Sequence, residues 1–464
     1  IQSATSTTVG DLPGTDDSNA LVGGQSALTG TDTSSLGLDI STGNTTFGTS
    51  GAVTGTTTAT QTASATGTDA EADADVLVTQ QTGIDLDGQT LSTGESASIT
   101  ASTTATNTAT ATSVGDDAFA NVDFETATGL GQTTGTITTG TSATIDASAA
   151  LTSSATATTT AGHTSGAVAQ VDTAGYDSQV AAINVDTITA GTDASITAAA
   201  SSTQTASASN VGTSVSNARN NATATVGSSD DVIGISDTTV DIGASSTSFT
   251  ASGSLTGSAT ANTTYGDATA KAGFTESHGL VALFPYPTKV VGLSTTGTDT
   301  LTIGQDATTG LDLDAATNLT SVANSTFEDA TASSDVYSIA NQGVDITVGR
   351  DAGTISGSSI NTASTTASTS GSATGADTAS ASIIQDSIGT QDATISIGDD
   401  GNLINFASIE ATSSATNVGD ITATGGVDFS TSSVDIDAQG IEQNTAQTID
   451  IGSTGNVQSQ AQVS

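Results

Sequence analysis

The chain holds few residues that could carry out catalysis. It contains no Cys and only two histidines, His163 and His278, and neither lies in a metal-ligating or nucleophile-activating motif. Paired carboxylates can cleave glycosidic bonds. Such sites usually hold sugar with Lys, Arg or aromatic side chains, and here aromatic residues make up only 3% of the chain. We therefore expect that the protein is not an enzyme.

Adjacent aspartates are the remaining candidates for a chemical role. Carboxylate oxygens suit Ca²⁺, and the candidate ligands are Asp116, Asp117, Asp230, Asp231, Asp399 and Asp400. No EF-hand loop or Gly-Gly-x-Gly-x-Asp repeat accompanies them. The alternative is a solvated acidic face that keeps a β-rich protein soluble and its strand edges unpaired. Apart from Ca²⁺, we expect no cofactor.

The charge balance limits the partners. The sequence has 48 Asp and Glu against 4 Lys and Arg, a formal charge of -44. Nucleic acid and anionic lipid require a basic face, so we expect neither as a partner. No apolar run is long enough to insert into a membrane. Divalent cations, and glycans on the N-x-[ST] sequons, are further candidates.

The start at Ile1 and the lack of Met predict a mature product that is secreted through a cleaved signal peptide. A chain shortened by design is the alternative. The absence of Cys excludes a disulfide framework, so other interactions must stabilise the fold.

A short signature recurs along the chain: an apolar residue, two further residues and a glycine. Successive glycines lie 45 to 61 residues apart, which indicates a repeat of about 51 residues. The nine copies begin at Ile40, Leu91, Ile137, Ile188, Val240, Leu301, Ile346, Ile395 and Ile449.

In most copies a second apolar residue follows the glycine by four to six positions. These residues are Phe47, Ile99, Ile145, Ile196, Phe249, Ile355 and Ile404. Alternating Thr or Ser and Ala usually comes next, as in residues 102–112. A period of two places one residue type on each face of a β-strand. We predict Ala facing inward and Thr outward in a thin, tightly wound sheet.

The repeats predict an all-β fold, a β-solenoid of about nine repeats. Thr, Ser, Gly and Asp are poor helix formers, and each repeat has too few large apolar residues to close a core without its neighbours. A repeat of about 51 residues would form three coils of about 17 residues or two of about 25. The body would then be a rod roughly 90 to 130 Å long, given a coil spacing of about 4.8 Å.

Two segments carry the repeat most clearly, residues 188–198 and 346–355, which read ITAGTDASITA and ITVGRDAGTI. They resemble the repeats of secreted β-helical adhesins of the filamentous haemagglutinin type. The resemblance implies an exported, elongated architecture associated with sugars or surfaces.

The predicted solenoid array covers residues 37–455. Residues 1–36 are an N-terminal extension, either a cap or a donor strand for a neighbouring copy, and residues 456–464 are a C-terminal tail. An apolar insertion at 274–293 forms either a covering loop or an arm that docks on another subunit. Its candidate assembly residues are Phe274, Leu280, Val281, Leu283, Phe284, Pro285, Tyr286 and Pro287.

These features predict an extracellular or cell-surface structural protein that polymerises with copies of itself into a filament, sheath or surface layer. An adhesin stalk or matrix protein is one alternative. A second is an ice-binding β-helix with outward Thr ladders, although uneven repeat lengths argue against an even ladder.

Overall fold

The computed structural model describes most of the chain. The described residues are 2–9, 17–22, 34–40, 43–131, 134–160, 166–171, 178–212, 220–227, 230–243, 246–273, 289–295, 299–303, 311–349, 354–370, 378–399, 401–418, 429–442, 448–451 and 456–464. All regular elements among them are β-strands, and every pairing between these strands is parallel. The predicted all-β solenoid is therefore confirmed.

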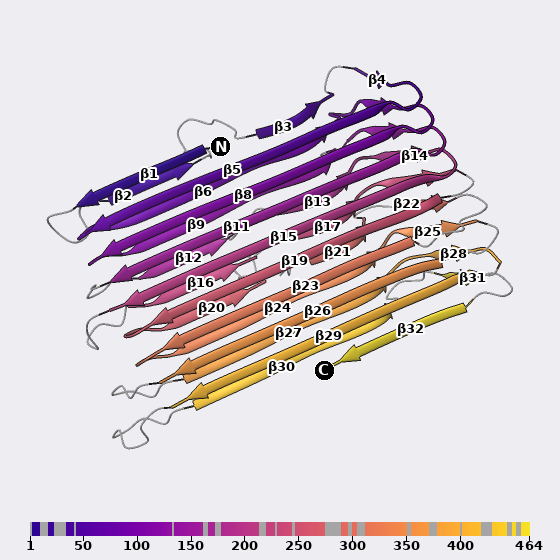
Figure 1. Cartoon of the computed structure of the whole chain (residues 1–464). Helices are drawn as coiled ribbons and strands as arrows, with labels where there is room; N and C mark the ends of the chain where they lie inside the picture. Colours follow the sequence, from indigo (N-terminus) through magenta and orange to yellow (C-terminus); the bar gives the residue numbers. More distant parts are fainter. Residues whose placement is uncertain are drawn as a thin grey trace.

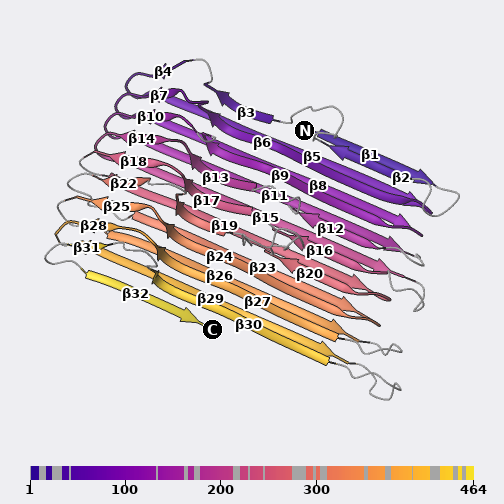
Figure 2. The ribbon, with the colours of Figure 1, turned by 180° about the vertical axis from the view of Figure 1, so that it is seen from behind.

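The strands form three sheets along the solenoid (Figures 1 and 2). Sheet 1 consists of β1 (Gln2–Val9), β5 (Ala52–Thr68), β8 (Ser98–Val114), β11 (Thr144–Thr160), β15 (Ala194–Val211), β19 (Ser246–Thr263), β23 (Leu311–Ser325), β26 (Thr354–Thr369), β29 (Asn402–Asn417) and β32 (Asn456–Val463).

Sheet 2 runs behind sheet 1. It consists of β2 (Asp17–Val22), β3 (Ser34–Asp39), β6 (Glu71–Asp85), β9 (Ala118–Leu130), β12 (Ala167–Val171), β13 (Ser178–Asn184), β16 (Ala222–Val226), β17 (Asp230–Ser236), β20 (Ala268–Ala272), β21 (Lys289–Ser294), β24 (Ala330–Gln342), β27 (Thr378–Gln391) and β30 (Phe429–Glu442).

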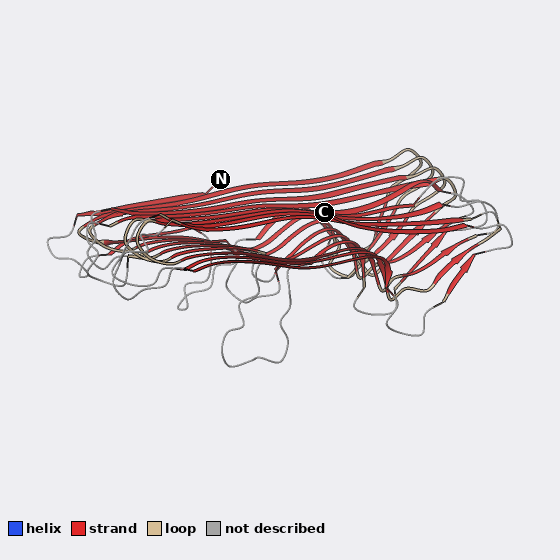
Figure 3. Cartoon of the chain, turned by 90° about the horizontal axis from the view of Figure 1, so that it is seen from below, coloured by secondary structure: helices blue, strands red, loops and turns tan. Residues whose placement is uncertain are grey.

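Sheet 3 has short strands and closes each coil at one side (Figure 3). It consists of β4 (Thr45–Thr46), β7 (Thr90–Ser92), β10 (Thr136–Thr138), β14 (Thr187–Ala190), β18 (Thr239–Ile242), β22 (Thr300–Ile303), β25 (Asp345–Val348), β28 (Ile395–Ile397) and β31 (Ile449–Ile451).

One repeat makes one coil, and the expected division into two or three coils is wrong. Each coil contributes one row to each sheet, and a typical strand of sheet 1, such as β8, is 17 residues long. The Thr/Ala alternation continues through such a strand without a turn residue, so the chain does not bend sooner. Nine coils at about 4.8 Å each span about 43 Å, less than half the expected rod length.

The alternation predicted for sheet 1 is confirmed. In β8, Ala101, Ala105, Ala109 and Ala111 are buried, and the Thr and Ser residues at even positions face outward. Small inward side chains let sheets 1 and 2 lie close together, and Figure 3 shows the two sheets face to face over most of their length.

The narrow interior contains buried hydroxyl groups as well as methyl groups. The hydroxyl of Thr103 in sheet 1 donates to the backbone carbonyl of Thr128 in sheet 2 at 2.6 Å. Ser359 donates to the carbonyl of Ser338 at 2.9 Å, and Ser387 donates to that of Ser359 at 2.9 Å. A buried polar group is costly unless it is hydrogen-bonded, so these bonds between the sheets allow a core rich in Ser and Thr.

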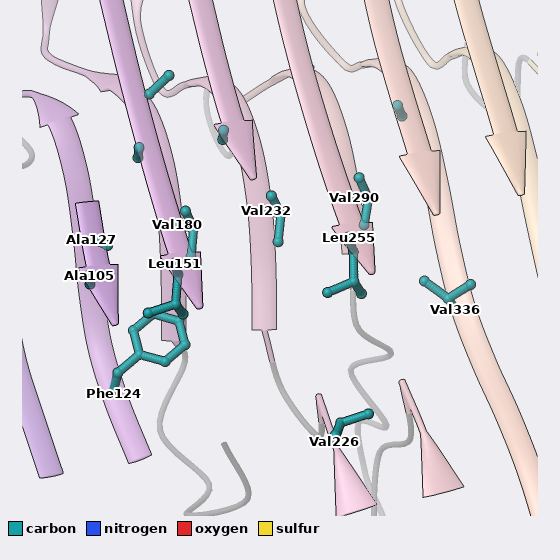
Figure 4. Close-up of a cluster of buried hydrophobic side chains, with 14 of the residues drawn as sticks. Ala105, Phe124, Ala127, Leu151, Val180, Val226, Val232, Leu255, Val290 and Val336 are labelled. Atoms are coloured by element: carbon teal, nitrogen blue, oxygen red, sulfur yellow. The ribbon is translucent and has the colours of Figure 1, made fainter. Parts of the chain in front are cut away.

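The interior also contains larger apolar side chains. Leu151 and Leu255 of sheet 1 lie among Val180, Val232 and Val290 of sheet 2 in Figure 4. The three valines are neighbours in register on successive coils. The core is therefore built from columns, by which we mean sets of residues that pair in register from coil to coil.

The second apolar residue of the repeat forms one such column in sheet 1. Its members are Val53, Ile99, Ile145, Ile196, Phe249, Leu311, Ile355, Leu403 and Val457. Phe47 and Ile404, which the spacing predicts for this column, do not lie in it. Ile404 pairs with Ser356 on the outer face and is 37% exposed, because Leu403 takes the inward position. Phe47 follows β4, where its amide bonds to the carbonyl of Ser92.

The apolar residue of the repeat signature forms the column of sheet 3. It runs through Leu91, Ile137, Ile188, Val240, Leu301, Ile346, Ile395 and Ile449. The first predicted copy is out of register: Thr45 pairs with Leu91, whereas the Ile40 amide bonds to the carbonyl of Asp85. The first coil therefore lacks the aliphatic residue that the other coils have in this column.

The glycine of the signature marks a corner where successive coils nearly touch. A Cβ on Gly140 would lie 2.5 Å from the carbonyl carbon of Gly94, and one on Gly191 would lie 2.5 Å from that of Gly140. Gly48, on the first coil, corresponds to Gly94 and would have nothing within 4 Å. Close approach of the backbone, rather than a special dihedral angle, explains the glycine.

Variation in repeat length lies largely outside sheet 1. The strands of sheet 1 pair residue by residue with a single irregularity, at Ala194 and Ser195. In three successive coils the strand of sheet 2 is divided into two parts, β12 and β13, β16 and β17, and β20 and β21, each aligned with a continuous strand such as β9 or β24. The longest interval in the chain includes the residues between β20 and β21.

Candidate functional site

The last described coil exposes side chains in columns that earlier coils bury. The strands β30, β31 and β32 are the last rows of the three sheets, and every residue of β32 is exposed. Val434, Val457 and Val463 are 46%, 49% and 52% exposed. The residues that pair with them on the preceding coil, Ile383, Leu403 and Ile409, are buried. Core columns therefore reach this end without a covering layer among the described residues.

The first described coil differs, because its core residues Ala20, Ile40 and Val53 are buried. The described parts of residues 1–36 form β1, β2 and the beginning of β3, which pair in parallel with β5 and β6. They lie in the same sheets as the coils that follow them. With β4 they form the first row of each sheet.

The first and last described strands of sheet 1 are shorter than the strands beside them. β1 pairs with Gln61–Thr68 of β5, and β32 pairs with Asn402–Ile409 of β29. Within the described part of the chain, Ala52–Thr60 at one end and Thr412–Asn417 at the other have no neighbouring strand on the outer side. Unpaired backbone N–H and C=O groups at a sheet edge are a template for strand addition.

The outer face of sheet 1 carries columns of hydroxyl groups. One column consists of Thr60, Thr106, Thr152, Thr203 and Thr256 on five successive coils. Neighbouring columns on the same face lie two residues away along the strands, a distance of roughly 6.6 Å. The coils are about 4.8 Å apart, so from β5 to β19 this face is a regular two-dimensional array made mostly of Thr and Ser. Acidic and apolar residues interrupt the array on β23 and β29.

Two aspartates of sheet 2, Asp75 on β6 and Asp335 on β24, have raised pKa values. Burial raises the pKa of Asp75 to about 6, with smaller contributions from the nearby charges of Asp73 and Asp123. Burial also raises the pKa of Asp335 to about 6, and the Asp386 charge adds to the effect. Like charges and desolvation both disfavour the ionised carboxylate.

Lowering the pH from 8 to 5 should therefore stabilise the protein. The folded pKa of Asp75 and Asp335 lies above the ordinary value of 3.8. Between about pH 4 and 6 the folded state binds more protons than the unfolded state, so stability rises as pH falls through 6. Thermal unfolding followed by circular dichroism at several pH values measures this.

The double variant Asp75→Asn and Asp335→Asn should flatten the pH dependence. Asp241→Asn, on an exposed position of β18, is the matched control for removing an acidic charge. A melting temperature that falls between pH 7 and 5, or a double variant that behaves like the control, would contradict the assignment.

The predicted Ca²⁺ ligands lie on three separate parts of the solenoid. Asp116 and Asp117 follow β8 at the corner between sheets 1 and 2, where the Asp116 carboxylate accepts from the Asp117 amide at 2.9 Å. Asp230 and Asp231 begin β17, and Asp399 follows β28. Asp400 is outside the described residues. Within the described ranges, no group of three or more acidic, His or Cys side chains is placed to hold a metal ion.

The predicted apolar arm falls on residues of which the structure describes only the end. Phe274, Leu280, Val281, Leu283, Phe284, Pro285, Tyr286 and Pro287 lie outside the described residues, as do His163 and His278. The described remainder of 274–293 belongs to β21, in the middle of sheet 2.

Sequence reasoning missed the exposed valines and a second glycine column. A Cβ on Gly83, Gly129, Gly234 or Gly292 would lie within 3.0 Å of backbone in sheet 1 or the next coil. Each of these glycines precedes the apolar residue of the repeat signature by six to nine positions, a signal that could have revealed the column.

Comparison with known proteins yields no relative: no family model matches the chain, and no curated protein or solved structure does. The part of the chain that the structure describes has no helix long and apolar enough to cross a membrane.

Proposed function

We propose that this chain is an extracellular structural protein whose copies assemble into a filament, sheath or surface layer. The observation that carries the proposal is the last described coil, where strand edges of the three sheets and half-exposed valines of the core columns face outward. A contact between two different surfaces of one molecule generates an open polymer when its rotation does not close a ring. The adhesin-like repeats support the cell-surface setting.

Polymerisation should depend strongly on salt. Each copy has a formal charge of -44, and repulsion between copies is screened over about 8 Å at an ionic strength of 0.15 M. Negative-stain microscopy and sedimentation test this between about 0.01 and 1 M NaCl. Over that range the screening length falls from about 30 Å to about 3 Å. We expect short bodies at low salt and filaments or layers at high salt. Monodisperse short bodies under all ionic conditions would overturn the proposal.

Paired lysine variants separate an end-to-end contact from a side-to-side one. Val457→Lys places a charge in an end that the proposal buries, and we expect it to prevent assembly. Thr152→Lys makes the same charge on the exposed outer face of sheet 1, in the middle of the body, and should assemble as the parent chain does. The reverse result would indicate lateral association.

A second candidate function is ice binding by the outer face of sheet 1. Uneven repeat lengths argue against it. The strands of sheet 1 nevertheless pair residue by residue, so the Thr and Ser columns are regularly spaced. A regular array of hydroxyl and methyl groups is the feature that would order water. The adhesin stalk or matrix role remains a further alternative.

Thermal hysteresis measured on the chain tests the ice-binding candidate. Thr152→Tyr puts a bulky group in the centre of the array and should abolish the activity. Thr331→Tyr, an exposed position on β24 of sheet 2, should leave it unchanged. If the parent chain shows no hysteresis, or if both variants lose it equally, sheet 1 is not an ice-binding face.

A further inference from the structure

Charged and large apolar side chains are rare on the outer face of sheet 1, and most of them lie together. The chain has 48 acidic residues, but at outward positions of the described strands of this sheet they are only Asp146, Asp312, Asp314 and Glu410. The Ile and Phe residues at outward positions are Ile360, Ile404 and Phe406. Except for Asp146, all of these belong to β23, β26 and β29, which are neighbours in the sheet (Figure 1).

Register between the three strands makes these residues one group. Strands lie about 4.8 Å apart, and outward residues of one strand lie roughly 6.6 Å apart. The positions on β23 are therefore about 10 Å from their partners in the same column on β29. The columns are Asp312, Ser356 and Ile404; Asp314, Ser358 and Phe406; Ala316, Ile360 and Ser408; and Asn318, Thr362 and Glu410. We define the mixed patch as Asp312, Asp314, Ile360, Ile404, Phe406 and Glu410.

The apolar part of the mixed patch is open to solvent. Ile360 and Ile404 are 44% and 37% exposed, and Phe406 is partly exposed. Single exposed aliphatic residues are common on proteins, whereas adjacent ones bordered by polar groups mark contact surfaces. The preceding coils have mainly Thr and Ser in the same columns. The repeat itself therefore does not require apolar residues at these positions.

The acidic part of the mixed patch favours a cation. Burial raises the pKa of Asp314, and the neighbouring Asp312 charge raises it further, whereas a hydrogen bond with Ser358 opposes the shift. A positive charge placed over the two carboxylates would offset their repulsion. A partner that covers the whole patch must therefore carry both aliphatic and basic side chains.

A second copy of the chain is poorly suited to supply these basic groups. The sequence has 4 Lys and Arg in total. Lys271 and Lys289 lie on the outer face of sheet 2, in one coil. Arg219 and Arg350 lie outside the described residues. Two copies would also bring together two chains that each have a formal charge of -44.

We infer that the mixed patch binds a segment of a different protein, one that presents aliphatic side chains next to Lys or Arg. In an extended segment, side chains on one side recur roughly every 6.6 Å, which is the spacing of Ile404 and Phe406 along β29. Two aliphatic side chains of the segment would cover these residues, and its cations would lie over the carboxylates. The patch is small, so the contact is weak and sensitive to salt. The inference goes beyond the proposed function, which concerns contacts between copies.

A labelled peptide of sequence Lys-Ser-Ile-Ser-Ile-Ser-Lys is the probe. Its Lys and Ile side chains lie on one side when the peptide is extended. Fluorescence anisotropy at low salt, where we expect separate copies, should show binding to the parent chain. Peptides with Glu in place of Lys, or with Ser in place of Ile, should bind about tenfold more weakly.

Two double variants test the two parts of the patch. I360S/I404S should weaken peptide binding about tenfold, and D312N/D314N about fivefold. Ser and Asn already occur at outward positions of this face, so both variants should fold, which circular dichroism checks. Val322→Ser and Asp146→Asn are the matched controls, because they make the same kinds of change on this face outside the patch. The controls should bind the peptide as the parent chain does.

Three results would overturn the inference: no binding of the peptide to the parent chain, equal binding by the parent chain and both double variants, or equal losses in the two controls. A fourth result concerns assembly without peptide. If I360S/I404S loses assembly, the mixed patch is a contact between copies, which overturns the inference and leaves the proposed function intact. Normal assembly of I360S/I404S together with weakened peptide binding supports the inference.

Discussion

Gly140→Ala should destabilise the solenoid by about 1–3 kcal/mol or more, the range for overpacking a close-packed site. The added Cβ would lie 2.5 Å from the carbonyl carbon of Gly94 and 2.6 Å from the amide nitrogen of Glu95. Both atoms belong to the backbone of the preceding coil, which is held by its own row of hydrogen bonds. No side chain can rotate away, so the two coils must separate locally.

Gly48→Ala is the matched control for this prediction. Gly48 occupies the same corner on the first coil, and its Cβ would meet nothing within 4 Å. Thermal and denaturant unfolding of the two variants below the concentration for assembly measures the difference. Equal destabilisation by both would show that the glycine serves a backbone conformation rather than contact between coils.

Ile196→Ala should cost about 2–5 kcal/mol, as is usual for removing a large aliphatic side chain from a core. Ile196 is fully buried and lies between Ile145 and Phe249 in its column. The vacated volume borders two other coils, and their strands are fixed in register, so the cavity cannot easily collapse. In a solenoid each coil contacts only its neighbours, so the damage should be local.

Hydrogen exchange across the chain would locate that damage. Amides of β11, β15 and β19 should lose protection in Ile196→Ala, while those of β26 and β29 should keep it. Val457→Ala is the control, because this member of the same column is 49% exposed and loses less burial. Denaturant unfolding should place its cost below about 1 kcal/mol. Similar costs for both variants would mean that the column is not a continuous core.

Patterns with a short period gave reliable expectations. The Thr/Ala alternation predicted which face of β8 is buried, because the side chains of any strand alternate with a period of two. Most of the aliphatic and glycine positions of the repeat signature also form real columns. The exceptions, Ile40, Phe47 and Ile404, lie in the first coil or one residue from the inward position, where spacing in the sequence does not specify register.

The size of a coil was the main error. A repeat length equals one coil or several, and composition does not distinguish these cases. The difference depends on how far a strand continues before the chain turns, which here is set by close packing of sheet 1 against sheet 2 through small residues and buried hydroxyls such as Thr103.

By itself the sequence determined the all-β class, the period and the small inward side chains, because these follow from local propensity and alternation. Only the tertiary structure decided the register between coils. Register brings Val53 and Val457 into one column, with Val53 in the second row of sheet 1 and Val457 in the last described row. Pairing between residues about fifty positions apart fixes these features, and no local pattern specifies it.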